Sequence, residues 1–186
     1  MKELSFEEAV AHVDGGGAFV DLRDVDSYLD VHIPGTIALL YEKGPGMASR
    51  ARDCIPLEVP LVLTDAATAD LAHAAASLRG KGFNVVGVVA DAINEWARRK
   101  ERPASTEVLH GAPSGPGIVL DVGDPGAATH PEGVHIPIER LWSRIDEVGD
   151  EERVIVLAGR GVRAALAVGI LERAGVSEVL FCKTRS

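Results

Sequence analysis

The sequence predicts an α/β protein in which mainly parallel strands alternate with helices. Short apolar runs rich in Val and Leu, such as LEVPLVLT at 57–64, are typical of buried strands. A helical pattern, LAHAAASLR at 71–79, follows that run. The same order of strand, turn and helix occurs twice along the chain. Strands that alternate with helices in this way predict open parallel sheets flanked by helices.

The first half begins with a helix and a strand. Ser5 and Glu8 have the spacing of a capping box, which predicts a helix over residues 6–13 that ends at the glycines at 15–17. The apolar run AFVDL at 18–22 predicts the first strand. The later helix at 71–79 is expected to end at Gly80 and Gly82, before another strand over 84–90.

The second half repeats this pattern in a shorter, more degenerate form. GPGIVLDVGD at 115–124 echoes GGGAFVDLRD at 15–24, and VIVLAGRGVRAALAVGILERAGV at 154–176 has the layout of residues 61–83. A segment dense in Pro, Gly and Ser, 98–117, predicts a linker or a meandering connection. We therefore predict two tandem domains, with the boundary near residue 104: 1–104 and 105–186.

Composition restricts the class of protein. The chain has 186 residues, of which 46% are hydrophobic, enough for one medium core or two small ones. The first ten residues lack the pattern of a signal peptide, and no apolar run approaches the roughly 20 residues that span a bilayer. We expect a cytoplasmic protein with no membrane association.

Charge and cysteine content exclude further classes. The net charge is −9 and the isoelectric point about 5.1, so the overall field repels phosphate backbones, and we expect no nucleic-acid partner. The two cysteines are far apart in sequence, without metal-ligand spacing to each other or to histidines. We predict no disulfide scaffold, no metal site and no cofactor.

One stretch of the first half carries a specific family signal. VDLRDVDSYLDVHIPGTIALLY at 20–41 contains Asp-x-Arg, then Tyr, then His-Ile-Pro-Gly. This pattern resembles the start of a rhodanese domain, a fold of sulfurtransferases. The resemblance extends through GFNVVGVVADAINEW at 82–96, and the second half is similar at IVLDVGD and HPEGVHIP. It implies two tandem rhodanese-like domains, in which His32 and His130 belong to a structural turn.

The resemblance also locates the catalytic positions. The family motif is Cys-x-x-Gly-x-Arg, and AGRGVRAA places Ala158, Gly161 and Arg163 in register with it; Asp65 occupies the cysteine position of the first half. Active members attack a sulfane sulfur with that cysteine and hold it as a persulfide. Alanine has no nucleophilic group, and a carboxylate at residue 65 should repel an anionic sulfur donor. We therefore expect no catalytic residue at either position.

Two catalytic alternatives stay open. Cys182 is followed by Lys183 and Arg185, which would favour its thiolate, so it is the candidate for an active thiosulfate sulfurtransferase. Cys54 is the weaker candidate, because its own segment lacks a glycine-rich turn. Asp65 would be the nucleophile of a hydrolase, but a helix N-cap at Asp65 or Thr68 is the simpler prediction.

The leading expectation is a non-catalytic rhodanese-like binding or regulatory module. In the second half, the turn between the predicted strand and the helix that follows it offers an oxyanion pocket. Glycines there let backbone N–H groups converge at a helix N-terminus beside two arginines. The residues expected to form this pocket are Gly159, Arg160, Gly161, Val162 and Arg163. The expected partners are a small oxyanion or sulfur-containing small molecule, or another protein.

Overall fold

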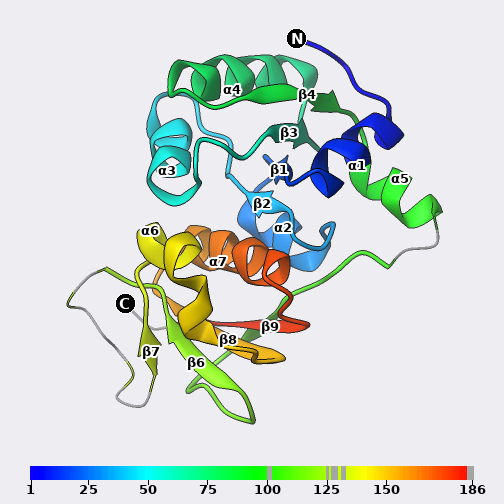
Figure 1. The fold of residues 1–186 in the computed structure, drawn as a ribbon. Helices are drawn as coiled ribbons and strands as arrows, with labels where there is room; N and C mark the ends of the chain where they lie inside the picture. The colour runs from blue at the N-terminus through cyan, green and yellow to red at the C-terminus, as the bar shows by residue number, and fades with distance from the viewer. Residues whose placement is uncertain (100–101, 125, 127–129, 131–132, 184–186) are drawn as a thin grey trace.

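The computed structural model describes residues 1–186 except 100–101, 125, 127–129, 131–132 and 184–186. Its helices and strands form two halves, stacked one above the other in Figure 1. The first half contains α1 (Phe6–Asp14), β1 (Ala18–Asp21), α2 (Val25–Asp30), β2 (Ile37–Ala38), α3 (Gly46–Cys54), β3 (Leu61–Thr64), α4 (Thr68–Gly80), β4 (Val85–Val89) and α5 (Ala92–Arg98). The second contains β5 (Glu107–Leu109), β6 (Ile118–Asp121), β7 (Val134–His135), α6 (Ile138–Leu141), the 3-10 helix η1 (Trp142–Val148), β8 (Arg153–Ala158), α7 (Gly161–Arg173) and β9 (Glu178–Lys183).

Each half has one parallel sheet. The first has the order β2-β1-β3-β4 and the second the order β5-β9-β8-β6-β7, and every strand pair in both is parallel. Across the second sheet, the neighbouring strands β7-β6-β8-β9 have the same relative order as β2-β1-β3-β4 in the first sheet. The predicted α/β class, with two mainly parallel sheets flanked by helices, is confirmed.

The boundaries of several elements differ from the prediction. The capping box of Ser5 and Glu8 is present and starts α1 as expected. The strand expected over 57–64 is limited to Leu61–Thr64, because Pro60 has no N–H to donate and Val59 closes a turn onto Pro56. The expected linker, 98–117, contains β5, which pairs with β9. This strand has only three residues, too few for a periodicity to be visible in the sequence, and its pairing with the buried strand β9 determines its conformation.

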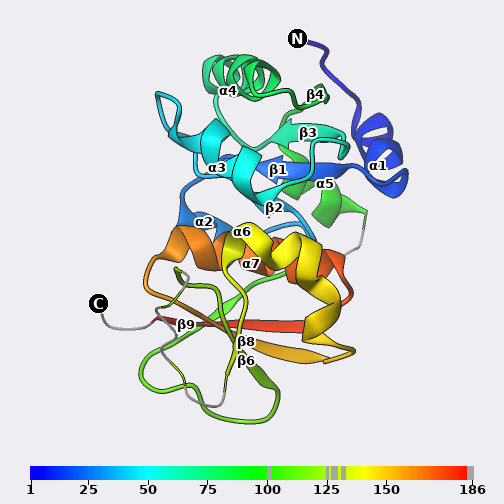
Figure 2. The same cartoon turned by 60° about the vertical axis from the view of Figure 1, so that its left-hand side comes forward.

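Helix α7 belongs to the second half but lies between the two sheets, and both views show it beneath β2 and α2 (Figures 1 and 2). Its residues Ala164 to Leu171 are all buried. At Gly169 a Cβ atom would overlap the carbonyl oxygen of Thr36, so only glycine permits this close approach of α7 to β2. One continuous core cluster includes Leu63 of β3, Leu166 of α7 and Val156 of β8. The two halves therefore share a core.

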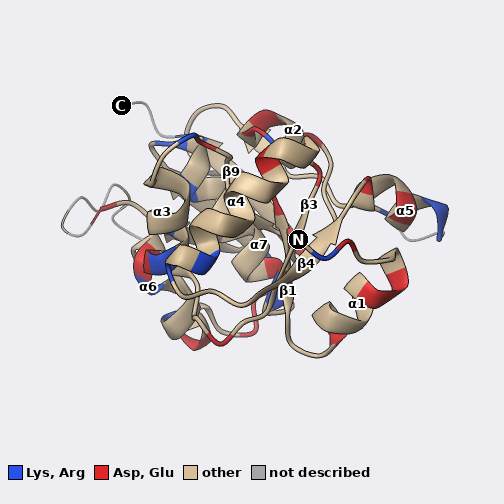
Figure 3. Cartoon of the chain, turned by 90° about the horizontal axis from the view of Figure 1, so that it is seen from above, with Lys and Arg blue, Asp and Glu red and all other residues tan. Residues whose placement is uncertain are grey.

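Charge is distributed without a continuous basic stripe on the face seen from above. Figure 3 shows acidic and basic segments interspersed over the first half, with acidic segments on α1 and α2. None of the helices in the described residues is long and apolar enough to cross a bilayer.

Candidate functional site

In parallel sheets, ligand sites form beyond the carboxyl ends of the strands, where strands lead into helices. The first of the two junctions singled out from the sequence contains Asp65, directly after β3. Its φ of 55° lies in the left-handed region, which aspartate tolerates better than most residues. The N-cap of α4 is Ala67, with no side-chain hydrogen bond to the helix, so the predicted caps at Asp65 and Thr68 are wrong. The left-handed turn directs the Asp65 carboxylate away from the helix and toward Thr64.

The carboxyl group of Asp65 is partly buried. Thr64 Oγ1 donates a hydrogen bond of 2.6 Å to Asp65 Oδ2. Burial raises the pKa of Asp65, and the nearby Asp21 carboxylate acts in the same direction, against the hydrogen bond from Thr64 and the charge of Arg23. This junction carries an acidic group in a setting that disfavours any further negative charge.

Arg23, the arginine of the Asp-x-Arg pattern, is held by hydrogen bonds to neighbouring residues. Arg23 Nη2 lies 2.6 Å from Asp21 Oδ2, and Arg23 Nε donates to the same carboxylate at 3.1 Å. Nη2 also donates to the carbonyl oxygen of Val31 at 2.7 Å. The Asp-x-Arg pattern is thus an internal ion pair that connects the end of β1 to the C-cap of α2, and it leaves little of the guanidinium for an external anion.

The second junction is shorter than the sequence suggested. Ala158 is the last residue of β8, is only 2% exposed and pairs with Lys183. Gly159 and Arg160 alone connect it to α7, which begins at Gly161. Gly161, Val162 and Arg163 therefore form the first helical turn, and the residues expected to form a wide loop are partly helical.

Arg163 is engaged by two carboxylates. Its Nη2 lies 2.5 Å from Asp124 Oδ1 and its Nη1 lies 3.1 Å from Glu139 Oε1. Nη1 also donates to the carbonyl oxygen of Val122 at 3.3 Å. An oxyanion would have to compete with both carboxylates for this guanidinium. Arg160 is exposed and makes no ion pair with any residue that the structure describes.

The second junction and helix α3 of the first half line a common cavity, which the sequence did not reveal. A cavity of about 420 Å³ lies between α3, α6 and the start of α7. Its lining residues are Glu42, Gly46, Ser49, Arg50, Asp53, Cys54, Ile138, Glu139, Arg160, Val162, Arg163 and Leu166. Three arginines and three acidic residues thus meet around one opening. The residues that line this cavity are separated by more than 100 positions in the sequence, so no local sequence pattern indicates it.

Cys54 lines this cavity but is not activated by it. Its side chain is 4% exposed, and burial raises its pKa to about 12. Glu139 and Asp53 add to that rise, and the opposing effects of Arg163 and Arg50 are smaller. Arg50 lies one helical turn before this cysteine on α3, and the fold adds Arg163 of α7, but burial and the carboxylates outweigh both arginines. The thiol is therefore protonated near neutral pH.

Cys182 lies on the other side of the second sheet. It is 1% exposed and belongs to the apolar cluster of Ile155, Leu157 and Leu180, whereas Ala158 belongs to the central core. Its Sγ donates to the carbonyl oxygen of Gly111 at 3.1 Å, and burial raises its pKa. The sulfur does not face the junction at residues 158–164.

The His-Ile-Pro-Gly turn is held by α7. His32 is fully buried, its Nδ1 lies 2.9 Å from the carbonyl oxygen of Tyr28, and its Nε2 lies 3.0 Å from Glu172 Oε1. The backbone N–H of Gly35 donates to Glu172 Oε2 at 2.7 Å. His32 is a structural group here, as its family position implied, and the sequence carried no signal for Glu172 as its partner.

No metal centre is visible in the part of the chain that the structure describes. There, no group of three or more His, Cys, Asp or Glu residues could hold an ion. His135 Nε2–H donates to the carbonyl oxygen of Gly123 at 3.3 Å, which gives this histidine a structural role.

Comparison with protein families gives one match. Residues 5–99 match the model of the rhodanese-like domain, which is about half of the chain. The matched region contains the Asp65 junction, and the Ala158 junction lies outside it. Comparison with curated protein sequences gives no match.

Several solved structures are similar at low identity. The thiosulfate sulfurtransferase from Pseudomonas aeruginosa is 16% identical with a TM-score of 0.45, over 100% of this chain and 41% of that one. The Alr3790 protein from Anabaena sp. is 19% identical with a TM-score of 0.46, over 56% of this chain and 82% of that one. SseA from Escherichia coli, a 3-mercaptopyruvate sulfotransferase, is 16% identical with a TM-score of 0.42, over 97% of each chain. This chain spans less than half the length of the Pseudomonas structure.

Proposed function

Because the chain belongs to the rhodanese-like domain family, we propose that it is a non-catalytic member, a binding or regulatory module made of two rhodanese-like domains, 1–104 and 105–186. One observation carries the proposal: neither strand-to-helix junction supplies a sulfur atom. Asp65 follows β3, and Ala158 ends β8. A persulfide cannot form on a carboxylate or on a methyl group.

The equivalence of the two halves supports the tandem assignment. Strands β1 and β6 occupy the same place in their sheets and end on Asp21 and Asp121. Both aspartates are buried, and each accepts the backbone N–H two residues later, at 2.9 Å from Arg23 and at 2.8 Å from Gly123. The same turn therefore follows the same strand twice, as expected for a duplicated unit.

The cysteines offer no substitute nucleophile. Cys54 is protonated near neutral pH, and Cys182 is buried on the face of its sheet opposite Ala158. A working sulfurtransferase that uses Cys182 would require this strand to open so that thiosulfate could reach the sulfur. The non-catalytic proposal requires no such opening.

The ligand that we propose for the second junction is a small oxyanion, held weakly. Arg160 is its main side chain, because Arg163 is engaged by Asp124 and Glu139. Arg160 lines the cavity between α3 and α7, and α7 is a helix of 13 residues whose first turn has no side-chain cap. The partial positive charge of that helix end adds to the charge of the guanidinium.

Sulfur transfer from thiosulfate to cyanide tests the first part of the proposal. We expect turnover equal to a control without protein, and no change on Cys54→Ser or Cys182→Ser. Turnover that persists through purification and disappears on Cys182→Ser would replace the proposal with a sulfurtransferase that uses Cys182.

A sulfate titration followed by backbone NMR tests the second part. We expect shifts at residues 158–163 in the millimolar range, and loss of these shifts on Arg160→Gln. Arg52→Gln, a matched charge change on α3 outside the cavity lining, should leave them unchanged. Shifts centred on Asp65, or none at millimolar sulfate, would remove the oxyanion from the proposal.

A further inference from the structure

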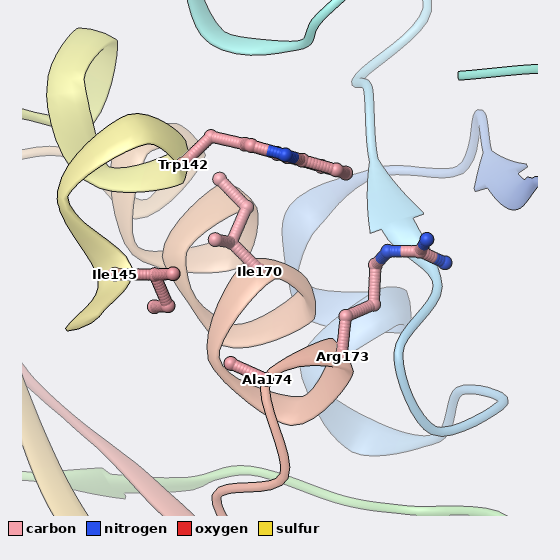
Figure 4. A pocket seen from close by; sticks show the side chains of 5 residues that line it. All are labelled: Trp142, Ile145, Ile170, Arg173 and Ala174. Atoms are coloured by element: carbon pink, nitrogen blue, oxygen red, sulfur yellow. The ribbon is translucent and has the colours of Figure 1, made fainter. Parts of the chain in front are cut away.

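A second cavity lies at the other end of α7, away from the junction described above. Its volume is about 190 Å³, and it is lined by Trp142 and Ile145 of η1, by Ile170 and Arg173 of α7, and by Ala174. Figure 4 shows the indole of Trp142 extending from η1 toward the side of the cavity on which Arg173 projects. Four apolar side chains and one guanidinium therefore surround the same space.

Arg173 is the unusual group in this cavity. Its side chain is partly buried, and desolvation lowers its pKa. Nη1 donates to the carbonyl oxygen of Gly17 at 2.9 Å, and Cζ lies 5.4 Å from the centre of the Trp142 ring. No carboxylate of the described residues lies within ion-pair distance of this guanidinium, in contrast to Arg163 and Arg23.

A partly buried cation without an acidic partner is stabilised when an anion reaches it. A guanidinium has five N–H donors, and one of them is used by Gly17, so donors are left for a planar acceptor such as a carboxylate. The indole and the aliphatic side chains favour a ligand whose remainder is apolar.

We propose that this cavity binds a small carboxylate with an apolar body, aromatic or short-chain aliphatic, with its carboxylate on Arg173 and its apolar part against Trp142 and Ile170. The volume lies below the range of roughly 300–1,000 Å³ typical of sites for drug-sized ligands, so the ligand is small and its binding weak. The site is independent of the oxyanion proposal, because the two cavities have no lining residue in common.

Three probe compounds separate the contributions to binding. Benzoate has the carboxylate and the apolar ring, benzamide has the same shape without the charge, and sulfate has charge without an apolar part. The chain has two tryptophans, so its indole N–H groups give two NMR signals, and Trp96→Phe assigns the one that belongs to Trp142. We expect benzoate to shift the Trp142 signal with saturation in the millimolar range or below, and benzamide and sulfate to leave it in place.

Two variants test the assignment to this cavity. Arg173→Gln should weaken benzoate binding at least tenfold. Because Arg173 also bonds to Gly17, a second variant, Ala174→Leu, narrows the cavity while keeping the guanidinium, and it should weaken binding as well. Arg98→Gln, on the exposed end of α5, is the matched control and should not affect binding.

Four results would overturn the proposal: no shift with millimolar benzoate, an equal shift with benzamide, an equal shift with sulfate, or benzoate binding that persists in both Arg173→Gln and Ala174→Leu. The first three concern the chemistry of the ligand and the last concerns its location. None of them depends on whether the Arg160 junction binds sulfate, so failure here is distinguishable from failure of the proposed function.

Discussion

The Nε2 atom of His32 lies 3.0 Å from Oε1 of Glu172, across the contact between the two halves of the chain. His32 is fully buried, and the Glu172 side chain is 13% exposed. The same carboxylate accepts the backbone N–H of Gly35. A turn of the first half is therefore held in place by a helix of the second half.

Removal of this carboxylate should destabilise the whole chain. We expect Glu172→Ala to lower the free energy of unfolding by about 3 kcal/mol, because it leaves the buried His32 ring and the Gly35 N–H without their acceptor. Glu172→Gln keeps a neutral acceptor and should cost about 1–2 kcal/mol. Urea unfolding at neutral pH measures both.

The matched control is Glu178→Gln, which removes a carboxylate that is 58% exposed and paired with Arg153. Its expected cost is below about 1 kcal/mol. If Glu172→Ala and Glu178→Gln cost the same, the contact between His32 and Glu172 does not hold the halves together.

Close contact between α7 and β2 should make Gly169 intolerant of any side chain. A Cβ atom there would overlap the carbonyl oxygen of Thr36 and lie 3.0 Å from its carbonyl carbon, both of them backbone atoms. We expect Gly169→Ala to lower the free energy of unfolding by about 2 kcal/mol or more. Gly80→Ala, where nothing lies within 4 Å of a Cβ, should be neutral or stabilise by up to about 1 kcal/mol. A similar response of both variants would contradict the packing of α7 against β2.

The sequence was informative where structure is local. The capping box of Ser5 and Glu8 predicts α1 because both partners lie within one helical turn. The apolar runs predict the central strands, since a parallel sheet buried on both faces requires continuous apolar sequence.

Contacts between residues that are distant in the sequence could not be predicted in this way. Glu172 meets His32 over 140 residues of sequence, and Arg163 meets Asp124 and Glu139 from a separate segment. A single sequence contains no signal for such partners, because they depend on how α7 packs. The same limit applies to the cavity with Cys54, whose neighbours come from α6 and α7. The predicted cap at Asp65 is wrong for a local reason, since the left-handed turn directs its side chain to Thr64.

The stability contributed by residue 65 should depend on pH. The pKa of Asp65 is raised in the folded protein, mainly by burial, so its charged form is less favourable there than in the unfolded chain. This destabilisation is absent below the unfolded pKa and complete above the folded pKa. We expect Asp65→Asn to raise the free energy of unfolding at pH 7, with a gain that shrinks as the pH falls toward the ordinary value of 3.8. Asparagine also tolerates the left-handed backbone.

Urea unfolding of both proteins across this pH range measures the gain as a difference. Asp70→Asn is the control, because Asp70 lies in the first turn of α4, where the helix end stabilises a carboxylate. We expect Asp70→Asn to lower the free energy of unfolding at pH 7, opposite to the effect of Asp65→Asn. An Asp65→Asn variant that is less stable at pH 7 would show that the carboxylate is stabilising and would contradict the assigned cause of its raised pKa.

Both native thiols should be unreactive in the folded protein. With a pKa of about 12, Cys54 is a thiolate in about one molecule in ten thousand at pH 8. Cys182 is buried, and its thiol donates to Gly111. We expect iodoacetamide to label neither residue at pH 8 on the time scale that labels both in urea, with peptide mass spectrometry as the readout. Rapid labelling of Cys182 without denaturant would show that its strand opens and would support the catalytic alternative.

The final prediction concerns a cysteine placed at the position that the family motif assigns to the nucleophile. Ala158 is 2% exposed and ends β8 within the shared core, so Ala158→Cys places a sulfur atom among apolar groups. Arg163, which would stabilise a thiolate, is engaged by Asp124 and Glu139, and its backbone N–H donates to the carbonyl oxygen of Arg160. We expect slow alkylation at neutral pH and no persulfide from thiosulfate, with mass spectrometry detecting the added sulfur.

The same variant combined with Asp124→Asn and Glu139→Gln releases Arg163 without changing the backbone. If the two carboxylates are what keeps this junction inactive, the combined variant should alkylate faster than Ala158→Cys alone, because the released guanidinium lowers the pKa of the new thiol. Equal, slow rates would assign the block to burial at the end of β8. Rapid alkylation and a persulfide in Ala158→Cys alone would instead mean that the junction lacks only its nucleophile, and that neither burial at the end of β8 nor the engagement of Arg163 blocks the chemistry.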